Sequence, residues 1–353
     1  MSSNTNGSLN FSRKILTAVG IVAIFALVVY LLGSLAQMLL GVFAGVLLAV
    51  LLDGLTGWLQ TVTRLPRILT LWIVILLLLG LGGLIGWLLG PRIAEQFVRL
   101  SERLPDAYES IRESLRANPW GRQLLQNVPT LDELVTPGSE VMGRVAGVFS
   151  TTVGALLSAL LVLFVGLYLA IDPRLYIDNA IRLVPENRRK RAREISAAIG
   201  HALRWWLAGR FASMAVVGLL TGIGLWIAGV PLAFTLGLIA AVLSFVPFVG
   251  PIISAIPAVL VALAESPILA VYVVIVYAAV QAMESYLITP LIQKRAVSLP
   301  PALLIVVQVV MGVLFGALGV FLATPFAVAV IVVIQMLYVE DVLGDSVTVM
   351  GEH

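Results

Sequence analysis

The sequence has no cysteine and only two histidines, His201 and His353. Without cysteine the chain has no disulfide bond, no thiolate metal ligand and no cysteine nucleophile. Two histidines alone do not make the usual histidine-rich metal site. These absences argue against a redox enzyme or a zinc enzyme, and we expect neither catalysis nor a bound metal or cofactor.

Charge is also scarce, since charged residues make up 12% of the 353 residues and ordinary globular domains carry about 25%. Hydrophobic residues instead reach 60%, and the mean hydropathy is +1.05. Long apolar stretches require the bilayer as solvent, where helices satisfy every backbone polar group. We therefore expect an all-α multi-pass membrane protein whose partner is the lipid bilayer. The net charge of +3 is small, so it indicates no nucleic-acid partner.

Apolar runs divide the first half of the chain into four predicted spans. A polar tail at 1–12 precedes three spans within 13–90, with a hairpin turn at Gly33, Ser34 and Gln37 between the first two. Residues 91–145 mix seven arginines with eight acids, and their apolar residues recur at helical spacing. This pattern predicts an extramembrane amphipathic helix, either a cap on the membrane domain or a membrane-surface helix. The fourth span is predicted at 146–171.

The segment 172–204 predicts the orientation of the chain. It carries eight basic residues and four acidic ones, a net charge of 8 − 4 = +4. The positive-inside rule places such a short loop in the cytoplasm. Counting spans back from this loop predicts an extracytoplasmic 91–145 segment and a cytoplasmic amino terminus, in a bacterial inner membrane.

Broken helices are expected in the second half, 205–339, before a polar tail at 340–353. Residues 231–264 contain prolines and a glycine near their middle and must cross the membrane an even number of times, which predicts a re-entrant hairpin. Residues 302–339 are too long for one span and contain Gly312, Gly316 and Pro325, so they form a second broken hairpin or two short spans. Paired broken segments are typical of transporter binding sites.

Glu284 is the most informative acid, because its surroundings are apolar apart from Gln281, which lies three residues earlier on the same helical face. A charge at membrane depth usually faces a bundle interior or an aqueous path. Glu284 therefore either serves a solute path or forms a structural ion pair with Arg210. Arg210 alternatively extends its side chain to the cytoplasmic interface.

Three secondary features complete the candidate set. Asp53 is expected to cap the cytoplasmic end of the second span, and Gln308 stands alone in apolar surroundings, where it either bonds to a neighbouring helix or contacts a solute. The break from Pro247 to Pro251 frees several backbone groups, which in lipid need protein partners or a water-lined cavity. The candidate solute or ion path comprises Glu284, Gln281, Pro247, Gly250, Pro251, Pro290, Gly312, Gly316 and Pro325, with Asp53, Arg210 and Gln308 as secondary candidates.

Four motifs together resemble one family. They are the Pro247–Pro251 break, the run QAMESYLITP at 281–290, the glycine segment from Gly312 through LATP at Pro325, and LYLAID at 167–172. In this order and spacing the chain resembles the autoinducer-2 exporter family of bacterial membrane proteins, from about Lys14 to Tyr338.

The resemblance implies an inner-membrane transporter with about eight membrane segments that assembles as a homo-oligomer, with a pentamer as the expected size. It leaves three functions open: export of a small polar solute such as autoinducer-2, sodium (or lithium)/proton antiport, and a non-transport membrane scaffold. For transport, the expected arrangement is a midplane site between the two broken hairpins, which Glu284 and Gln281 face and in which Glu284 is the candidate proton or cation carrier.

Overall fold

The computed structural model describes residues 5–84, 86, 87, 91, 152–288 and 300–345; within these ranges, the side chains of residues 5–32, 34 and 152–158 are not described. This part of the chain is helical and has no strand. Five of its helices are long and apolar enough to cross a membrane, or six if one bent pair counts as a span. The predicted all-α multi-pass fold is confirmed, while the 91–145 segment beyond Pro91 and the candidate Pro290 lie outside the described residues.

The helices follow one another along the chain with short connections. They are α1 (Thr5–Thr63), a helix from Arg67 to Leu84, α6 (Thr152–Ile171), α7 (Pro173–Arg182), the 3₁₀ turn η1 (Glu186–Arg188), α8 (Arg189–Ile227), α9 (Ala233–Leu243), α10 (Val249–Glu265), α11 (Pro267–Met283), the π-helical turn η2 (Glu284–Ile288), α13 (Pro301–Ile334) and the π-helical turn η3 (Gln335–Glu340).

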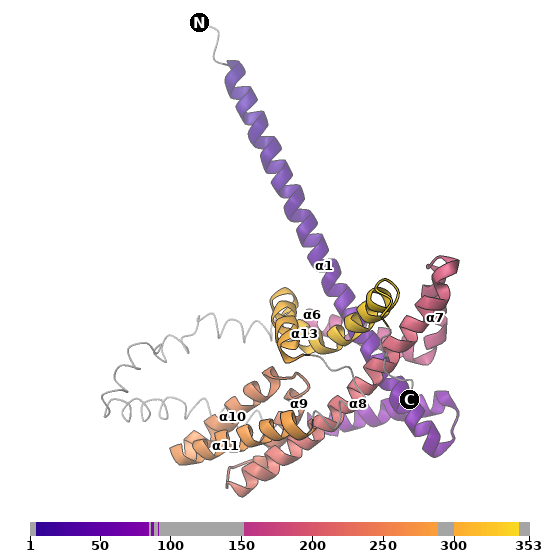
Figure 1. Ribbon diagram of the computed structural model, residues 1–353. Coiled ribbons are helices and arrows are strands. Elements are labelled where there is room, and N and C mark those ends of the chain that lie inside the picture. Colours follow the sequence, from indigo (N-terminus) through magenta and orange to yellow (C-terminus); the bar gives the residue numbers. More distant parts are fainter. Residues whose placement is uncertain (1–4, 85, 88–90, 92–151, 289–299, 346–353) are drawn as a thin grey trace.

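The predicted hairpin at Gly33 is wrong, because α1 is one helix of 59 residues that passes through this position without a break. Figure 1 shows it as the long helix that extends beyond the rest of the fold. No proline lies between residues 5 and 63, and isolated glycine and serine residues weaken a helix without ending it. The chain reverses instead at Arg64–Pro66, where Arg64 has a φ of +56°. One continuous helix before Arg64 does not supply the two crossings from which a cytoplasmic amino terminus is predicted.

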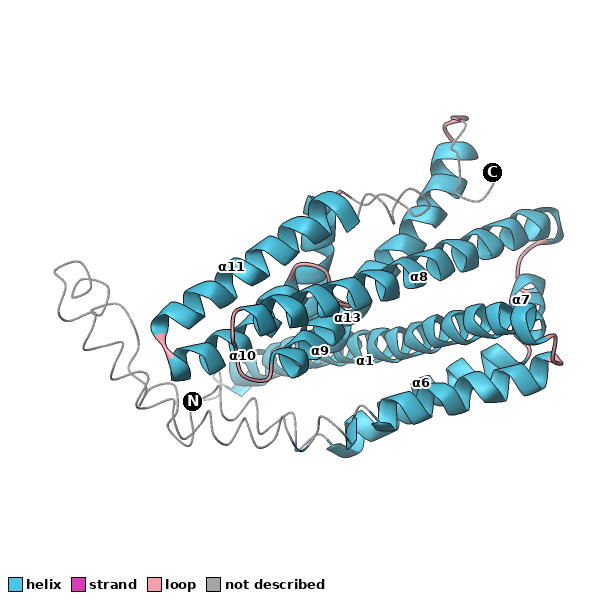
Figure 2. Ribbon diagram, turned by 90° about the horizontal axis from the view of Figure 1, so that it is seen from below, coloured by secondary structure: helices cyan, strands magenta, loops and turns pink. Residues whose placement is uncertain are grey.

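Small residues bring α1 and α6 close together, side by side in Figure 2. A Cβ atom at Gly41 would meet the side chain of Leu161, and one at Gly45 would lie 2.6 Å from that of Val165. The two contacts advance together along both helices, so α1 and α6 run parallel. Their carboxyl ends therefore lie at the same end of the bundle. We call it the basic end because Arg64, Arg67 and the segment 172–204, which contains α7 and the start of α8, are found there.

The predicted break in 231–264 is confirmed, since two short helices, α9 and α10, flank residues 244–248. Helix α9 packs antiparallel to α8, with Gly218 facing Ala241 and Gly222 facing Gly237. Helix α10 returns along α9 and is followed by α11, as Figure 2 shows. At the point of reversal α9 and α10 nearly touch, because a Cβ atom on Gly250 would overlap the carbonyl oxygen of Leu243.

The second predicted break is also present, at Gly316 within α13. Gly316 has φ +64° and ψ −147°, a backbone conformation that is essentially restricted to glycine. The helix folds back there, since a Cβ atom on Gly319 would overlap the carbonyl oxygen of Met311. The region is thus a helix broken at Gly316 and folded back on itself, and Pro325 lies buried in its second arm.

Candidate functional site

A buried ion pair lies next to the first helix break. Arg210 of α8 and Glu284, the first residue of η2, approach to 3.2 Å between Nη1 and Oε1. Their side chains are only 11% and 7% exposed. Ser213, one turn after Arg210, donates a hydrogen bond of 2.9 Å to the same carboxylate oxygen. The predicted ion pair with Arg210 is therefore present, and Arg210 does not extend to the interface.

The same arginine also holds the broken backbone. Its Nε donates a hydrogen bond of 3.0 Å to the carbonyl oxygen of Phe245, which lies in the segment between α9 and α10. From the other side, Gln308 of α13 donates a hydrogen bond of 3.0 Å to the carbonyl oxygen of Pro247. A carbonyl freed by a helix break needs a partner in a low-dielectric interior. Two candidates that stood apart in the sequence, Arg210 and Gln308, supply those partners.

Phe248, at the centre of the break, has an unusual backbone conformation. Its φ of +63° and ψ of −51°, with a 2.7 Å hydrogen bond from the Val249 amide to the Pro247 carbonyl, make a γ-turn of the rare, strained form. Such strain persists only where the surroundings hold it in place. Here Gln308 of α13 donates a hydrogen bond to the same Pro247 carbonyl, so a contact from a helix distant in sequence maintains the turn.

Aromatic rings close the site on the side of the basic end. Phe245 stacks on Phe321 of α13 at 4.2 Å between ring centroids and meets Trp206 edge-on at 5.6 Å. The ring of Phe245 is buried in the largest apolar cluster of the described chain, together with Leu203, Leu207 and Leu322. The backbone carbonyl of Phe245 thus accepts a hydrogen bond from Arg210, while its ring packs between Trp206 of α8 and Phe321 of α13.

The remaining path candidates take different places. Gln281 is half-buried, one helical turn before Glu284, and Pro251 lies half-buried in the first turn of α10. Gly250 permits the close approach of α9 and α10, while Gly312 and Gly316 shape the hairpin of α13. These positions act through the backbone. The polar groups that the structure brings together are Arg210, Ser213, Glu284 and Gln308, with the carbonyls of Phe245 and Pro247.

Asp53 does not act as a helix cap. It lies within α1 and forms ion pairs with Arg67 at 2.8 Å and with Arg204 at 3.0 Å. Arg67 also donates a hydrogen bond to the carbonyl oxygen of Ala170 at the end of α6. Asp53 therefore ties three helices together at the basic end, outside the site around Glu284.

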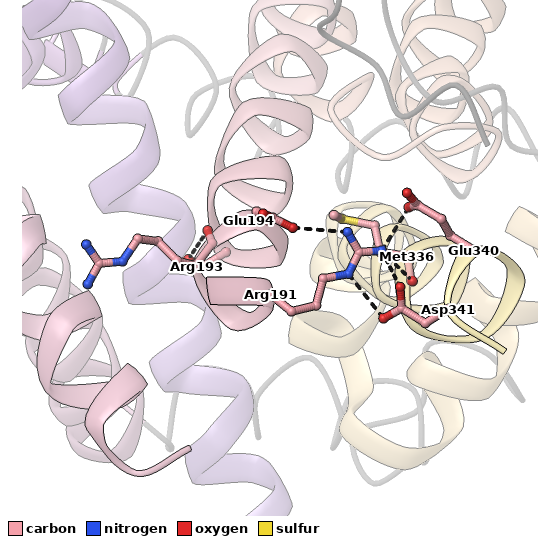
Figure 3. A network of polar contacts seen from close by, with 7 residues as sticks. Arg191, Arg193, Glu194, Met336, Glu340 and Asp341 are labelled. Carbon is pink, nitrogen blue, oxygen red and sulfur yellow. Dashed lines mark hydrogen bonds and ion pairs between the residues drawn. The ribbon is translucent and has the colours of Figure 1, made fainter. Parts of the chain in front are cut away.

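A second ion network joins α8 to the end of the described chain (Figure 3). The guanidinium of Arg191 contacts the carboxylates of Glu340 and Asp341 at 2.8 Å each, and that of Glu194 at 3.2 Å. It also donates to the carbonyl oxygen of Met336. The hydrogen bond to Glu340 is the largest of the influences that raise the pKa of Arg191. The end of η3 is thus held at the basic end by a permanently charged group.

The sequence pointed to Glu284 and to the break but not to Ser213 or Phe245, which have ordinary neighbours in their own helices. No group of three or more acidic, histidine or cysteine side chains that could hold a metal ion occurs in the described residues. Arg210 Nη2 is buried and has no hydrogen-bond partner in that part of the chain. A guanidinium with one unpartnered nitrogen is suited to a ligand oxygen.

Replacing Gln308 with leucine is expected to destabilise the protein by about 1–2 kcal/mol, because the carbonyl of Pro247 would lose its side-chain donor in an apolar interior. Thermal unfolding of the purified protein in detergent measures this change. Gln335→Leu, at the start of η3 directly after α13, is the matched control and should have a smaller effect. Equal effects of the two substitutions would contradict the role given to Gln308.

Comparison with known proteins places the chain in a family. The model of the AI-2E family transporters matches residues 19–338. The chain is 27% identical over 274 residues to "Putative transport protein YueF" of Bacillus subtilis, with 74% of each chain covered. It is 28% identical over 302 residues to "Putative transport protein YrrI" of the same organism, with 82% of this chain and 84% of the relative covered. The match over nearly all of its length shows that this chain belongs to the AI-2E transporter family of multi-pass membrane proteins.

Proposed function

We propose that this protein is a secondary transporter of the bacterial inner membrane that exports a small polar solute such as autoinducer-2. Family membership supports membrane transport, and the site around Glu284 supports a polar organic solute. In this proposal the protein works as a homo-oligomer, with a pentamer as the expected size, and the basic end faces the cytoplasm.

The observation that carries the proposal is the buried Arg210–Glu284 pair at the helix break. Arg210 already neutralises the carboxylate at 3.2 Å, so a sodium or lithium ion at Glu284 would have to displace a guanidinium that also holds Phe245. A solute with hydroxyl or carbonyl oxygens can instead accept a hydrogen bond from the spare Nη2 of Arg210 while the pair stays intact. The site therefore favours solute export over cation/proton antiport.

The break supplies the conformational part of the mechanism. Arg210 and Gln308 anchor the carbonyls of Phe245 and Pro247 from two different helices, and the strained turn at Phe248 directly follows the second of them. A solute that draws Arg210 away from the Phe245 carbonyl would free one anchor and let the strained turn relax. Movement of α9 and α10 relative to α13 then exposes the solute to the other side of the membrane.

Transport by the full-length protein in liposomes tests the proposal, with autoinducer-2 flux and the sodium-driven change of internal pH measured side by side. We expect flux without a sodium-dependent pH signal. Glu284→Gln should reduce that flux by roughly 10-fold, because a charge-assisted hydrogen bond becomes a neutral one. Glu186→Gln, on the exposed turn η1, serves as the control and should transport like the wild type.

Other outcomes would overturn the proposal. A sodium-dependent pH signal that Glu284→Gln abolishes would mean cation/proton antiport, with Glu284 as the ion carrier. Neither signal in a demonstrably folded protein would exclude autoinducer-2 and favour another solute or a scaffold.

A further inference from the structure

Helix α7 leaves the preceding span almost at a right angle. The angle between α6 and α7 is 93°. The turn has a local cause: Pro173 cannot continue α6, and the side chain of Asp172 caps α7 by accepting a hydrogen bond from the Leu175 amide. Helix α6 has 20 residues, none of them charged, and this length is enough to cross the bilayer. A helix perpendicular to it at its end lies in the plane of the membrane surface.

One face of α7 carries an uncovered apolar strip. Tyr176, Ala180 and Leu183 follow the i, i+4, i+7 spacing of a single helical face, and all three are exposed. Leu183 is 88% exposed. Ile181, on the other side of the helix, is buried against the protein. An amphipathic helix with this pattern, lying in the surface plane, fits the boundary between headgroups and acyl chains.

The basic residues around this strip fall into two groups. Four arginines pair with acids: Arg189 with Glu186, Arg193 with Asp178, and Arg204 with Asp53. The fourth, Arg191, pairs with Glu194, Glu340 and Asp341. The other four bases of the loop have no acidic partner among the described residues, and all are exposed: Arg174, Arg182, Arg188 and Lys190. These four cations are therefore available for a partner outside the chain.

The loop also brings these cations together. Arg189 folds back to donate hydrogen bonds to the carbonyl oxygens of Arg182 and Val184, which draws the end of α7 to the start of α8. Arg182, Arg188 and Lys190 consequently flank one compact turn next to the apolar strip. Guanidinium groups bind phosphate oxygens through paired hydrogen bonds.

We infer that residues 173–190 form a binding surface for the anionic phospholipids of the cytoplasmic leaflet, with Tyr176, Ala180 and Leu183 inserted at the interface and the four unpaired cations on the headgroup phosphates. Apolar insertion and surface cations add to one another in such helices. This surface lies away from Glu284, so the inference is independent of which solute is transported.

The depth of α7 can be measured cleanly because the chain has no cysteine. Spin labels on Ala180→Cys and on the control Asn187→Cys are compared in full-length protein reconstituted into vesicles of phosphatidylcholine and phosphatidylglycerol. The label at 180 should collide preferentially with oxygen, and the label at 187 with a water-soluble nickel reagent. Preferential collision of both labels with the nickel reagent would overturn the insertion of α7.

Lipid selectivity tests the charges. Spin-labelled phosphatidylglycerol should associate with the protein at least about fivefold more strongly than phosphatidylcholine, as expected for a single effective surface cation. The fourfold variant R174Q/R182Q/R188Q/K190Q should lose this preference, whereas the charge-neutral pair D178N/R193Q should keep it. A preference retained in the fourfold variant would overturn the inference. The wild-type protein provides a further test, because added salt should weaken its preference for phosphatidylglycerol by screening the charges. A preference that salt does not change would contradict the inference.

Discussion

Replacing Glu284 with alanine is expected to lower the free energy of unfolding by about 3–5 kcal/mol, because it leaves the charge of Arg210 buried without its counter-ion. Arg210 would keep only the carbonyl of Phe245 as a hydrogen-bond acceptor among the contacts described above. Its side chain is 11% exposed, so water cannot fully replace the carboxylate. Denaturant unfolding of the purified protein in detergent measures the loss.

The double variant Arg210→Met/Glu284→Leu separates charge burial from general damage to the site. Replacing both members of a buried pair with apolar residues of similar size is often neutral or stabilising. We therefore expect the double variant to regain most of the stability that Glu284→Ala loses, yet to remain inactive because no guanidinium is left for the solute. The destabilisation of the double variant is compared with the sum of those of Arg210→Met and Glu284→Leu measured singly. If the two values were equal, the pair would not act as a unit.

Gly250→Ala is the second change with a large expected effect, of about 3 kcal/mol. The added Cβ atom would overlap the carbonyl oxygen of Leu243, and backbone atoms cannot move aside as a flexible side chain can. The two arms of the first hairpin would have to separate, which would shift the Pro247 carbonyl away from Gln308. Both stability and solute flux should fall, as measured by thermal unfolding and by liposome transport.

Gly57→Ala is the matched control for that substitution. Gly57 lies within α1 and has open space where a Cβ atom would be added, so alanine there should stabilise the helix by about 0.5–1 kcal/mol. If Gly250→Ala were equally harmless, α9 and α10 would not be in the close contact described here, and the break would not depend on a glycine.

Features encoded over short distances could be predicted from the sequence. Apolar runs long enough to cross a bilayer predict the all-α membrane fold, and the cluster of Pro247, Gly250 and Pro251 predicts a break because proline removes a backbone donor. Gly316 likewise marks the place where α13 folds back. The failure at Gly33 is informative: a glycine and a serine without a proline did not end α1, since helix propensity alone is a weak signal in a long apolar segment.

The site itself was decided by contacts between residues far apart in the chain. The sequence shows that Glu284 needs an explanation, but its neighbours cannot reveal that Arg210 and Ser213, more than seventy positions away, share its carboxylate. Nor can local pattern show that Arg210 and Gln308 hold the carbonyls of the first break, or that Asp53 joins three helices instead of capping one. Hydrophobic period and proline position act within one helix and therefore determine where helices form and break. The partners of buried polar groups depend on which helices pack together, and only the tertiary structure determines that.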